Sequence, residues 1–170
     1  MASPHRLVIV RHSKAEAYAG TDAERRLSDR GRKDAAAAGA WLATQGSAPD
    51  RALVSGALRT RETWELLAKA AGWAVDAEFD DALYGADEDT VLDILRTVDE
   101  SVGSVVLVGH NPTVGMLAQL LDDGDGDPSA VDSLVLGYPT SAVTVFDVPV
   151  PWARLGPGSA TLRGYEVGRG

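Results

Sequence analysis

The chain of 170 residues contains no cysteine. Disulfide bonds, zinc sites built from thiolates and a cysteine nucleophile are therefore all excluded. A chain without cysteine is typical of proteins that never meet an oxidising compartment, so the sequence predicts a cytoplasmic location. Carboxylates and histidines are not clustered with metal-ligand spacing either, and we expect neither a metal nor a cofactor.

Basic residues are scarce, since 16 Lys and Arg face 25 Asp and Glu and leave a formal net charge of -9. Nucleic acid is disfavoured as a partner because duplex binding depends on lysine and arginine neutralising phosphates. The overall field would also repel an anionic substrate. Affinity for such a substrate would have to come from cations within about a Debye length, roughly 8 Å at physiological salt. Arg11 and Arg59 are the candidates.

Long apolar runs are missing as well. The first apolar run of the chain, residues 7–10, is far shorter than the apolar segment of a signal peptide. The longest uncharged stretch, residues 101–121, could span a bilayer by length, but it contains His110 and Pro112, and we expect no membrane span. The length predicts a single domain over residues 1–170 and leaves the oligomeric state open.

What the chain does contain is an alternation of apolar runs with helical periodicities. This pattern predicts an α/β fold, a three-layer α/β/α sandwich around a mostly parallel sheet. Strands are expected at 7–10, 52–54, 74–79, 105–108 and 142–148, the last as a candidate edge strand because prolines follow it. Helices are expected from Ser28 to Gly46, up to Gly72, from about Asp89 through Val102, and from Pro112 with Asn111 as its N-cap. The tail from Trp152 onward has no clear pattern.

The stretch 122–132 is acidic and contains glycines. It does not match a calcium-binding EF-hand, because Pro128 stands where that loop needs glycine and Leu134 where it needs glutamate. We therefore expect a solvated loop, whose role the sequence does not indicate.

Two of the three histidines follow predicted strands. Arg11 and His12 close the strand at 7–10, His110 closes the strand at 105–108, and Arg59 lies shortly after the strand at 52–54. Ligands of open α/β sheets bind beyond the carboxyl ends of strands, so these segments are expected to meet in one crevice. A lone histidine at a strand end is more often structural. The joint occurrence instead favours a phosphatase site, in which an imidazole accepts a phosphoryl group and guanidinium groups hold it.

The motifs around these residues resemble the histidine phosphatase superfamily, and within it the small SixA-type phosphohistidine phosphatases. They are LVIVRH at 7–12, LSDRGR at 27–32, SGALRTRET at 55–63 and VGHNP at 108–112. The motifs run in the family's order up to about residue 121. The resemblance implies a phosphoglycerate mutase-like fold, with His12 as the nucleophile and Arg11, Arg59 and His110 holding the phosphoryl oxygens.

The chemistry of these side chains agrees with such roles. A guanidinium offers forked donors that match phosphoryl oxygens. His12 must attack through an unprotonated nitrogen, so its other nitrogen should donate to a backbone carbonyl or a carboxylate. The neighbouring Arg11 and Arg59 disfavour its protonation. His110 is expected to act as a donor, protonated once a phosphate dianion arrives, next to a helix start whose N–H groups face an anion.

Three further residues are candidates. Ser13 stands where many members of the superfamily have glycine. Its hydroxyl could contact the phosphate, or serine could merely be tolerated in the turn, and the sequence favours neither alternative. Asn111 is a candidate for substrate binding through its place beside His110. Asp81 is the candidate acid for the leaving group, with Asp80 and Glu78 close by, and a surface or capping role for it is equally open.

The substrate is a phosphorylated protein or a small phosphorylated compound. Imidazole leaves without strong acid assistance, so a missing acid would favour phosphohistidine. The connections between the predicted strands and helices are short and leave few residues that could form a lid over a small substrate. We therefore expect removal of a phosphoryl group from phosphohistidine on a protein, or from a phosphoester, through phospho-His12 and without metal. The alternatives are a small-molecule phosphate monoester phosphatase or mutase, and a non-catalytic phosphate-binding module.

Overall fold

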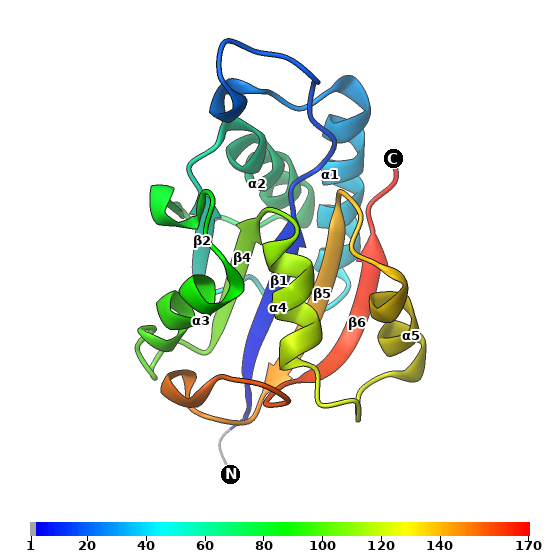
Figure 1. Cartoon of the computed structure of the whole chain (residues 1–170). Coiled ribbons are helices and arrows are strands. Elements are labelled where there is room, and N and C mark those ends of the chain that lie inside the picture. Colours follow the sequence, from blue (N-terminus) through cyan, green and yellow to red (C-terminus); the bar gives the residue numbers. More distant parts are fainter. Residues whose placement is uncertain (1–2) are drawn as a thin grey trace.

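In residues 3–170, which a computed structural model describes, six strands form one sheet in the order β3-β2-β4-β1-β5-β6 (Figure 1). The strands are β1 (His5–Arg11), β2 (Arg51–Ser55), β3 (Ala77–Asp80), β4 (Ser104–Gly109), β5 (Ala142–Val148) and β6 (Thr161–Val167). The first four run parallel to one another, while β5 pairs antiparallel with β1 and β6 antiparallel with β5. The prediction of a mostly parallel sheet is confirmed.

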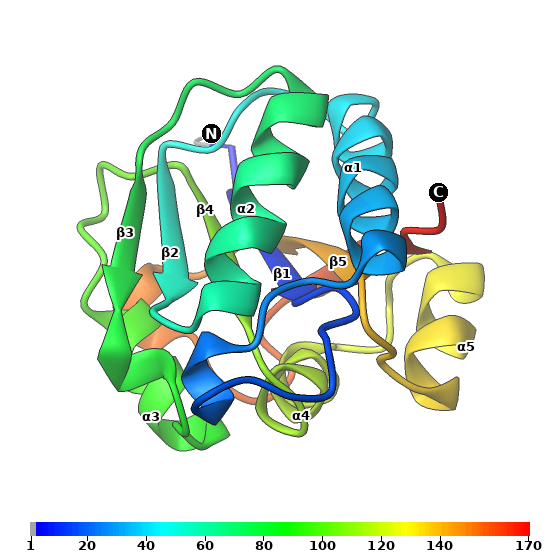
Figure 2. The same ribbon diagram turned by 90° about the horizontal axis from the view of Figure 1, so that it is seen from above.

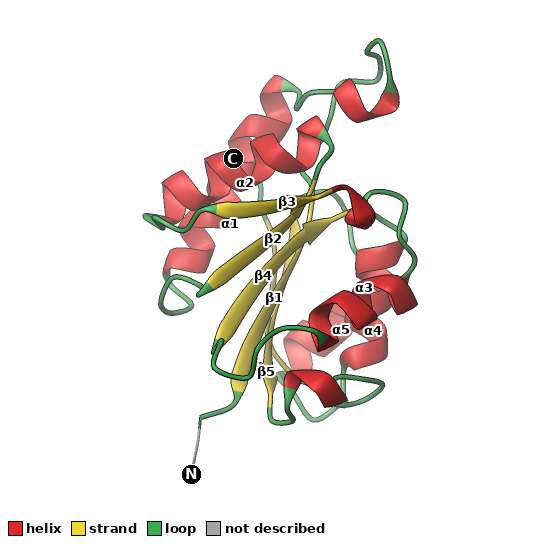
Figure 3. Ribbon diagram, turned by 90° about the vertical axis from the view of Figure 1, so that its left-hand side faces the viewer, coloured by secondary structure: helices red, strands yellow, loops and turns green. Residues whose placement is uncertain are grey.

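Helices cover both faces of this sheet (Figure 3). Helices α1 (Asp29–Ala43) and α2 (Leu58–Ala71) pack on one face. The opposite face is covered by α3 (Glu88–Arg96), α4 (Thr113–Leu121) and α5 (Pro128–Leu136). The three-layer α/β/α prediction is therefore confirmed. Seen from above, the long segment between β1 and α1 crosses the end of the sheet near α2 and α4 (Figure 2).

Strand β1 shows why the central strands are continuously apolar. Leu7 and Ile9 belong to the core beneath α3, α4 and α5, whereas Val8 and Val10 belong to the core beneath α1 and α2. Successive side chains of a strand point to opposite faces, so a strand covered on both sides must be apolar at every position. This burial holds the end of β1, and with it Arg11 and His12, in a rigid frame.

Helix α1 starts where its cap predicts and packs closely against its neighbours. Ser28 Oγ accepts a hydrogen bond from Gly31 N at 3.0 Å, which confirms Ser28 as the N-cap. A Cβ at Gly31 would lie 2.0 Å from the carbonyl oxygen of Lys14, and a Cβ at Gly39 would lie 2.1 Å from that of Leu67. The two glycines therefore let α1 approach the segment after β1 and helix α2.

Two predicted helix boundaries were wrong. Helix α4 begins at Thr113 with Pro112 in the N-cap position, one residue later than expected, but Asn111 still caps the first turn: its Oδ1 accepts from Gly115 N at 3.1 Å. The helix expected from about Asp89 to Val102 ends at Arg96. The apolar residues beyond it are still covered, so their spacing reflected burial of an irregular segment and not a continuing helix.

The region after α4 also differs from expectation. The predicted loop 122–132 runs into α5, which starts at Pro128 with the Asp127 side chain capping Ala130 N at 2.9 Å. Strand β5 is not an edge strand, because β6 pairs with it on its outer side. The third strand, expected at 74–79, covers Ala77–Asp80. Among residues 3–170 no helix combines the length and apolar character needed to cross a membrane.

Candidate active site

The carboxyl ends of β1 and β4 bring two imidazoles together. Arg11 pairs with Gly109 in the parallel register of these strands, and His12 N donates to Gly109 O at 3.1 Å. The next residue on each strand is a histidine, and the ring centroids of His12 and His110 lie 5.4 Å apart. The strand ends thus place in contact two residues that are far apart in the chain, as expected for this edge of the sheet.

The ring of His12 is buried and oriented through one of its nitrogens. Its Nδ1 donates to the carbonyl oxygen of Ser13 at 2.8 Å, as the sequence predicted for a nucleophilic imidazole. Burial lowers the pKa of His12 to about 3, with smaller contributions from the charges of His110, Arg59 and Arg11, while the hydrogen bond to Ser13 opposes the shift. The ring is therefore neutral near pH 7, and Nε2 carries a free lone pair.

The ring of His110 is held through the other nitrogen. Its Nε2 lies 2.7 Å from Ser55 Oγ, at the end of β2. Burial lowers the pKa of His110 to about 4; the charge of Arg59 lowers it further, and that of Asp22 raises it. In the tautomer in which Nε2 accepts the Ser55 hydroxyl proton, Nδ1 is the N–H donor of the neutral ring.

Among residues 3–170, three buried side-chain nitrogens or oxygens have no hydrogen-bond partner: Arg11 Nε, Arg59 Nε and His110 Nδ1. All three belong to residues predicted to hold phosphoryl oxygens. Buried donors are normally paired, and leaving one unpaired costs about 1–3 kcal/mol. An oxyanion offers acceptor oxygens of the kind that such donors lack.

Arg11 and Asn111 share a backbone acceptor. Arg11 Nη1 donates to the carbonyl oxygen of Tyr138 at 3.1 Å, and Asn111 Nδ2 donates to the same oxygen at 2.7 Å. Burial lowers the pKa of the Arg11 guanidinium. The Asn111 side chain thus links the start of α4 to the segment that orients Arg11.

Ser13 packs beneath the histidines. Its side chain is fully buried, and its hydroxyl lies 2.5 Å from Ser141 Oγ. Its backbone N donates to Thr63 Oγ1 at 3.0 Å. The residue whose carbonyl holds His12 is therefore itself held by a buried hydroxyl from α2, a contact that nothing in the spacing of the sequence indicated.

Asp81, the candidate acid, lies just after β3 in a short turn, η2 (Asp81–Leu83). It is exposed, and its carboxylate lies against Gly56: a Cβ at Gly56 would be 1.9 Å from Asp81 Oδ1. Within residues 3–170 its side chain makes no hydrogen bond with His12, Arg59 or His110. The structure thus brings together the four main predicted residues, while Asp81 stands apart from their contacts.

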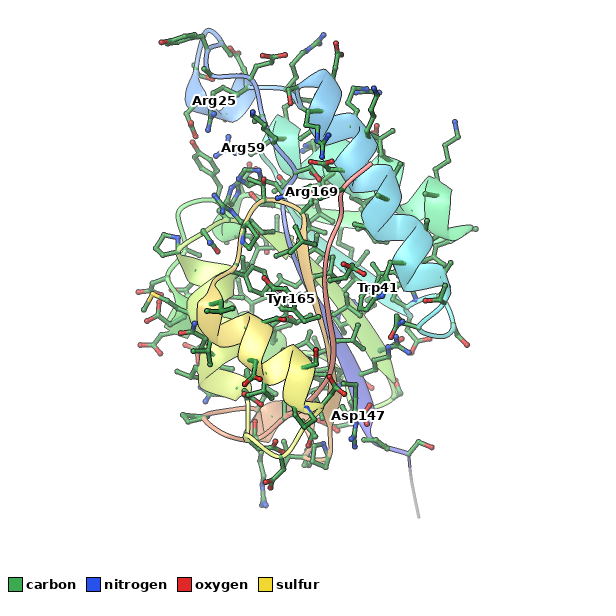
Figure 4. All side chains as sticks on the ribbon, turned by 90° about the vertical axis from the view of Figure 1, so that its right-hand side faces the viewer. Arg25, Trp41, Arg59, Asp147, Tyr165 and Arg169 are labelled. Atoms are coloured by element: carbon green, nitrogen blue, oxygen red, sulfur yellow. The ribbon has the colours of Figure 1, made fainter. Side chains whose placement is uncertain are left out.

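A different carboxylate, which sequence reasoning missed, touches the site. Asp22 lies in the turn η1 (Asp22–Glu24) between β1 and α1, and its Oδ2 accepts from Arg59 Nη2 at 3.0 Å. Tyr84 donates its hydroxyl to the same carboxylate, and its ring meets His110 edge-on at 5.5 Å. Both residues come from segments with no periodic pattern, so only the fold reveals their position. Arg25 and Arg59 lie at the same end of the sheet (Figure 4).

These residues could bind a tetrahedral anion and attack it through an imidazole nitrogen, which is the chemistry of phosphoryl transfer to histidine. Within residues 3–170 no group of three or more carboxylates or histidines is arranged to hold a metal ion.

The chain belongs to the histidine phosphatase superfamily (branch 1), whose family model matches residues 7–100. It is therefore a phosphatase, a hydrolase acting on phosphoester or phosphoramidate bonds, and it has the phosphoglycerate mutase-like fold. The resemblance seen in the sequence is confirmed.

Several relatives match over nearly the whole chain. An uncharacterised protein of Mycobacterium tuberculosis is 36% identical over 94% of this chain and 100% of its own length. A structure from Nakamurella multipartitia, described as a candidate phosphohistidine phosphatase SixA, is 31% identical with a TM-score of 0.83 and covers 97% of this chain and 96% of its own. The protein histidine phosphatase SixA complexed with tungstate is 26% identical with a TM-score of 0.77, covering 95% and 96%.

Proposed function

We propose that this phosphatase removes the phosphoryl group from phosphohistidine carried on a protein, through a covalent phospho-His12 intermediate and without a metal ion. The observation that carries the proposal is the set of three unpaired buried nitrogens, Arg11 Nε, Arg59 Nε and His110 Nδ1, beside a neutral His12 ring. Donors left unpaired around a nucleophile are what a phosphoryl site requires before its substrate arrives. A SixA protein of the same fold binds tungstate, which is also a tetrahedral oxyanion.

The first step is attack by His12 Nε2 on phosphorus. A new N–P bond forms as the P–N bond of the substrate breaks, and the departing imidazole takes a proton from water. Arg11, Arg59 and His110 donate to the phosphoryl oxygens and neutralise the charge that spreads over them. Binding of the dianion favours the protonated form of His110, whose pKa is held low in the empty site.

In the second step water attacks phospho-His12, the N–P bond breaks, and phosphate leaves with the oxygen of that water. One proton of the water passes to solvent. His12 returns to its starting state because Nδ1 keeps its hydrogen bond to the Ser13 carbonyl throughout. No step requires a Lewis acid, since guanidinium groups supply the positive charge.

The carboxylates around the site support a P–N substrate. Asp22 touches Arg59, but the hydrogen bond from Tyr84, with smaller contributions from Arg59 and Arg25, lowers its pKa to about 2, so it has no proton to give near pH 7. Asp81 makes no hydrogen bond to the site residues. Imidazole is a far better leaving group than an alkoxide without a positioned acid. The SixA relatives are named for the same substrate class.

The test is a rapid-quench experiment with a labelled phosphohistidine peptide. Wild-type protein should yield an acid-labile, base-stable phosphoprotein, the His12→Gln variant should yield none, and EDTA should leave turnover unchanged. His5→Gln is the matched control, because His5 lies at the opposite end of the same strand, β1. Absence of label from the wild type, or label retained by His12→Gln, would contradict the proposal.

Substrate class is tested separately. Turnover of the phosphohistidine peptide should exceed that of a phosphoserine peptide and of sugar phosphates at equal concentration. Equal or higher rates on the sugar phosphates would instead identify a small-molecule phosphatase. Tungstate binding with no turnover of any substrate would identify a phosphate-binding module.

A further inference from the structure

Asp22 receives every hydrogen bond that the Arg59 guanidinium makes within residues 3–170. Arg59 Nη1 donates to the backbone oxygen of Asp22 at 2.9 Å, and Nη2 donates to its carboxylate at 3.0 Å. The remaining guanidinium nitrogen, Nε, is buried and unpaired. The guanidinium is therefore held through both Nη atoms by a single residue of the segment after β1, while Nε has no partner.

The same carboxylate joins two other segments. Asp22 Oδ1 accepts from Arg25 Nε at 3.0 Å, and Arg25 in turn donates to Glu16 O at 3.0 Å, which closes the loop on itself. Tyr84, from the turn after β3, donates its hydroxyl to Asp22 Oδ2. The Tyr84 ring centroid lies 5.9 Å from the Arg59 guanidinium carbon. Asp22 is thus the point at which the loop after β1, helix α2 and the turn after β3 meet.

The base of that loop is fixed independently of Asp22. Ser28 N donates to Lys14 O at 2.9 Å, and Glu16 N donates to Arg26 O at 2.8 Å. The backbone bridge between residues 15 and 27 belongs to the same base. Loss of the Asp22 carboxylate would therefore leave the loop attached to the protein while removing one of the two hydrogen bonds that orient the Arg59 guanidinium, since the bond from Nη1 to the Asp22 backbone oxygen would remain.

We propose that Asp22 is a positioning residue of the phosphoryl site, which acts through Arg59 by holding the guanidinium with its Nε directed toward the bound phosphoryl group. A free arginine side chain populates many rotamers, and fixing it before the substrate binds removes that entropic cost from binding and from the transition state. The inference rests on the proposed function, because it assigns Arg59 to the phosphoryl group.

For removal of the Asp22 carboxylate, electrostatic repulsion and a positioning role predict opposite changes in oxyanion affinity. A carboxylate near an anion site repels the anion, so its removal should strengthen oxyanion binding if charge alone mattered. If Asp22 positions Arg59, its removal should weaken binding despite the lost repulsion. The sign of the change in tungstate affinity therefore separates the two roles.

The experiment is a double-mutant cycle with Asp22→Ala, Arg59→Ala and the combined variant. Hydrogen bonds to charged groups contribute about 1.5–3 kcal/mol, so Asp22→Ala should lower tungstate affinity and kcat/KM by about 10- to 100-fold. In the Arg59→Ala background the same substitution should change neither quantity by more than about twofold, because residues that act as a unit are not additive. Tungstate affinity is measured by calorimetry and kcat/KM with the phosphohistidine peptide.

Glu24→Gln is the matched control, since it removes the same charge from the same turn and, among residues 3–170, its carboxylate accepts only from Thr21 N. Its kinetics should equal those of the wild type. Asp22→Asn keeps one acceptor oxygen and should fall between wild type and Asp22→Ala, which provides the answer if the alanine variant does not fold. Tyr84→Phe keeps the ring but not the donor, and should lose only a few-fold.

Tighter tungstate binding by Asp22→Ala or Asp22→Asn would overturn the positioning role, and so would equal losses from Asp22→Ala with Arg59 intact and in the Arg59→Ala background. These results differ from failure of the proposed function. If the wild type showed no turnover or phospho-His12, the tungstate cycle would still report whether Asp22 acts through Arg59.

Discussion

The buried imidazole of His12 and the half-buried imidazole of His110 should make the ligand-free protein sensitive to mild acid. Environment lowers the pKa of His12 to about 3 and that of His110 to about 4, against 6.5 for a free imidazole. As pH falls below 6.5 the unfolded chain binds protons at both positions and the native protein does not, so the free energy of unfolding decreases. The loss continues down to the native pKa values.

The size of this effect follows from the distance between the assay pH and the unfolded pKa. At about pH 5.5, one unit below 6.5 and well above both native values, each histidine reduces the free energy of unfolding by about 1.4 kcal/mol relative to pH 8. The two together account for about 3 kcal/mol, a large fraction of the roughly 5–15 kcal/mol that stabilises a typical domain. Ordinary carboxylates contribute little in this window because they titrate at lower pH.

Urea unfolding at the two pH values measures the effect. His12→Gln and His110→Gln should each remove about half of the pH-dependent loss, because glutamine does not titrate. Tungstate at the lower pH should offset part of the loss in the wild type, since a bound anion favours the protonated form of His110. Equal wild-type stability at both pH values, or an undiminished loss in both variants, would contradict proton uptake by these two histidines as the cause.

Three other substitutions test the packing and the donors around the site. Thr63→Val should lower the free energy of unfolding by about 1–3 kcal/mol and also reduce kcat, because it leaves the buried N–H of Ser13 without its acceptor. Thr63→Ser keeps the hydroxyl and should retain activity. Urea unfolding and steady-state kinetics check both variants. Gly39→Ala should destabilise by about 1–3 kcal/mol in thermal unfolding, because its Cβ would meet the Leu67 carbonyl, and wild-type stability would contradict the close helix contact. Arg11→Lys should raise the tungstate Kd at least about tenfold, since an ammonium cannot supply both donors of the guanidinium; unchanged affinity would exclude Arg11 from the anion site.

The sequence alone predicted the architecture, which the structure confirms, and the four candidate residues of the phosphoryl site. A continuous apolar run such as residues 105–108 indicates by itself a strand that is buried on both faces. The positions just beyond such strands are where α/β sheets bind ligands. Arg11, His12, Arg59 and His110 were therefore predicted as site residues from local patterns. The capped start of α1 at Ser28 was equally local, since an N-cap depends on residues three apart.

Boundaries that depend on competition between contacts were decided only in the folded protein. Asn111 was expected at the N-cap position of α4, but the helix begins one residue later, at Thr113. The Asn111 side chain still accepts from Gly115 N in the first turn, and it also donates to Tyr138 O. Helix α5 carried a local signal in Asp127 and Pro128, which the acidic composition around it obscured. Pairing of β5 with β6 depends on a strand whose own pattern was weak.

The same distinction applies to the carboxylates. Asp81 was chosen by its place in the chain, whereas the carboxylate that contacts Arg59 is Asp22, from a loop without periodicity. A hydrogen bond between residues far apart in sequence leaves no trace in the spacing of either residue, because it depends on how the loops after different strands come together. Local patterns therefore reveal which residues can do the chemistry, and only tertiary structure determines which groups hold them in place.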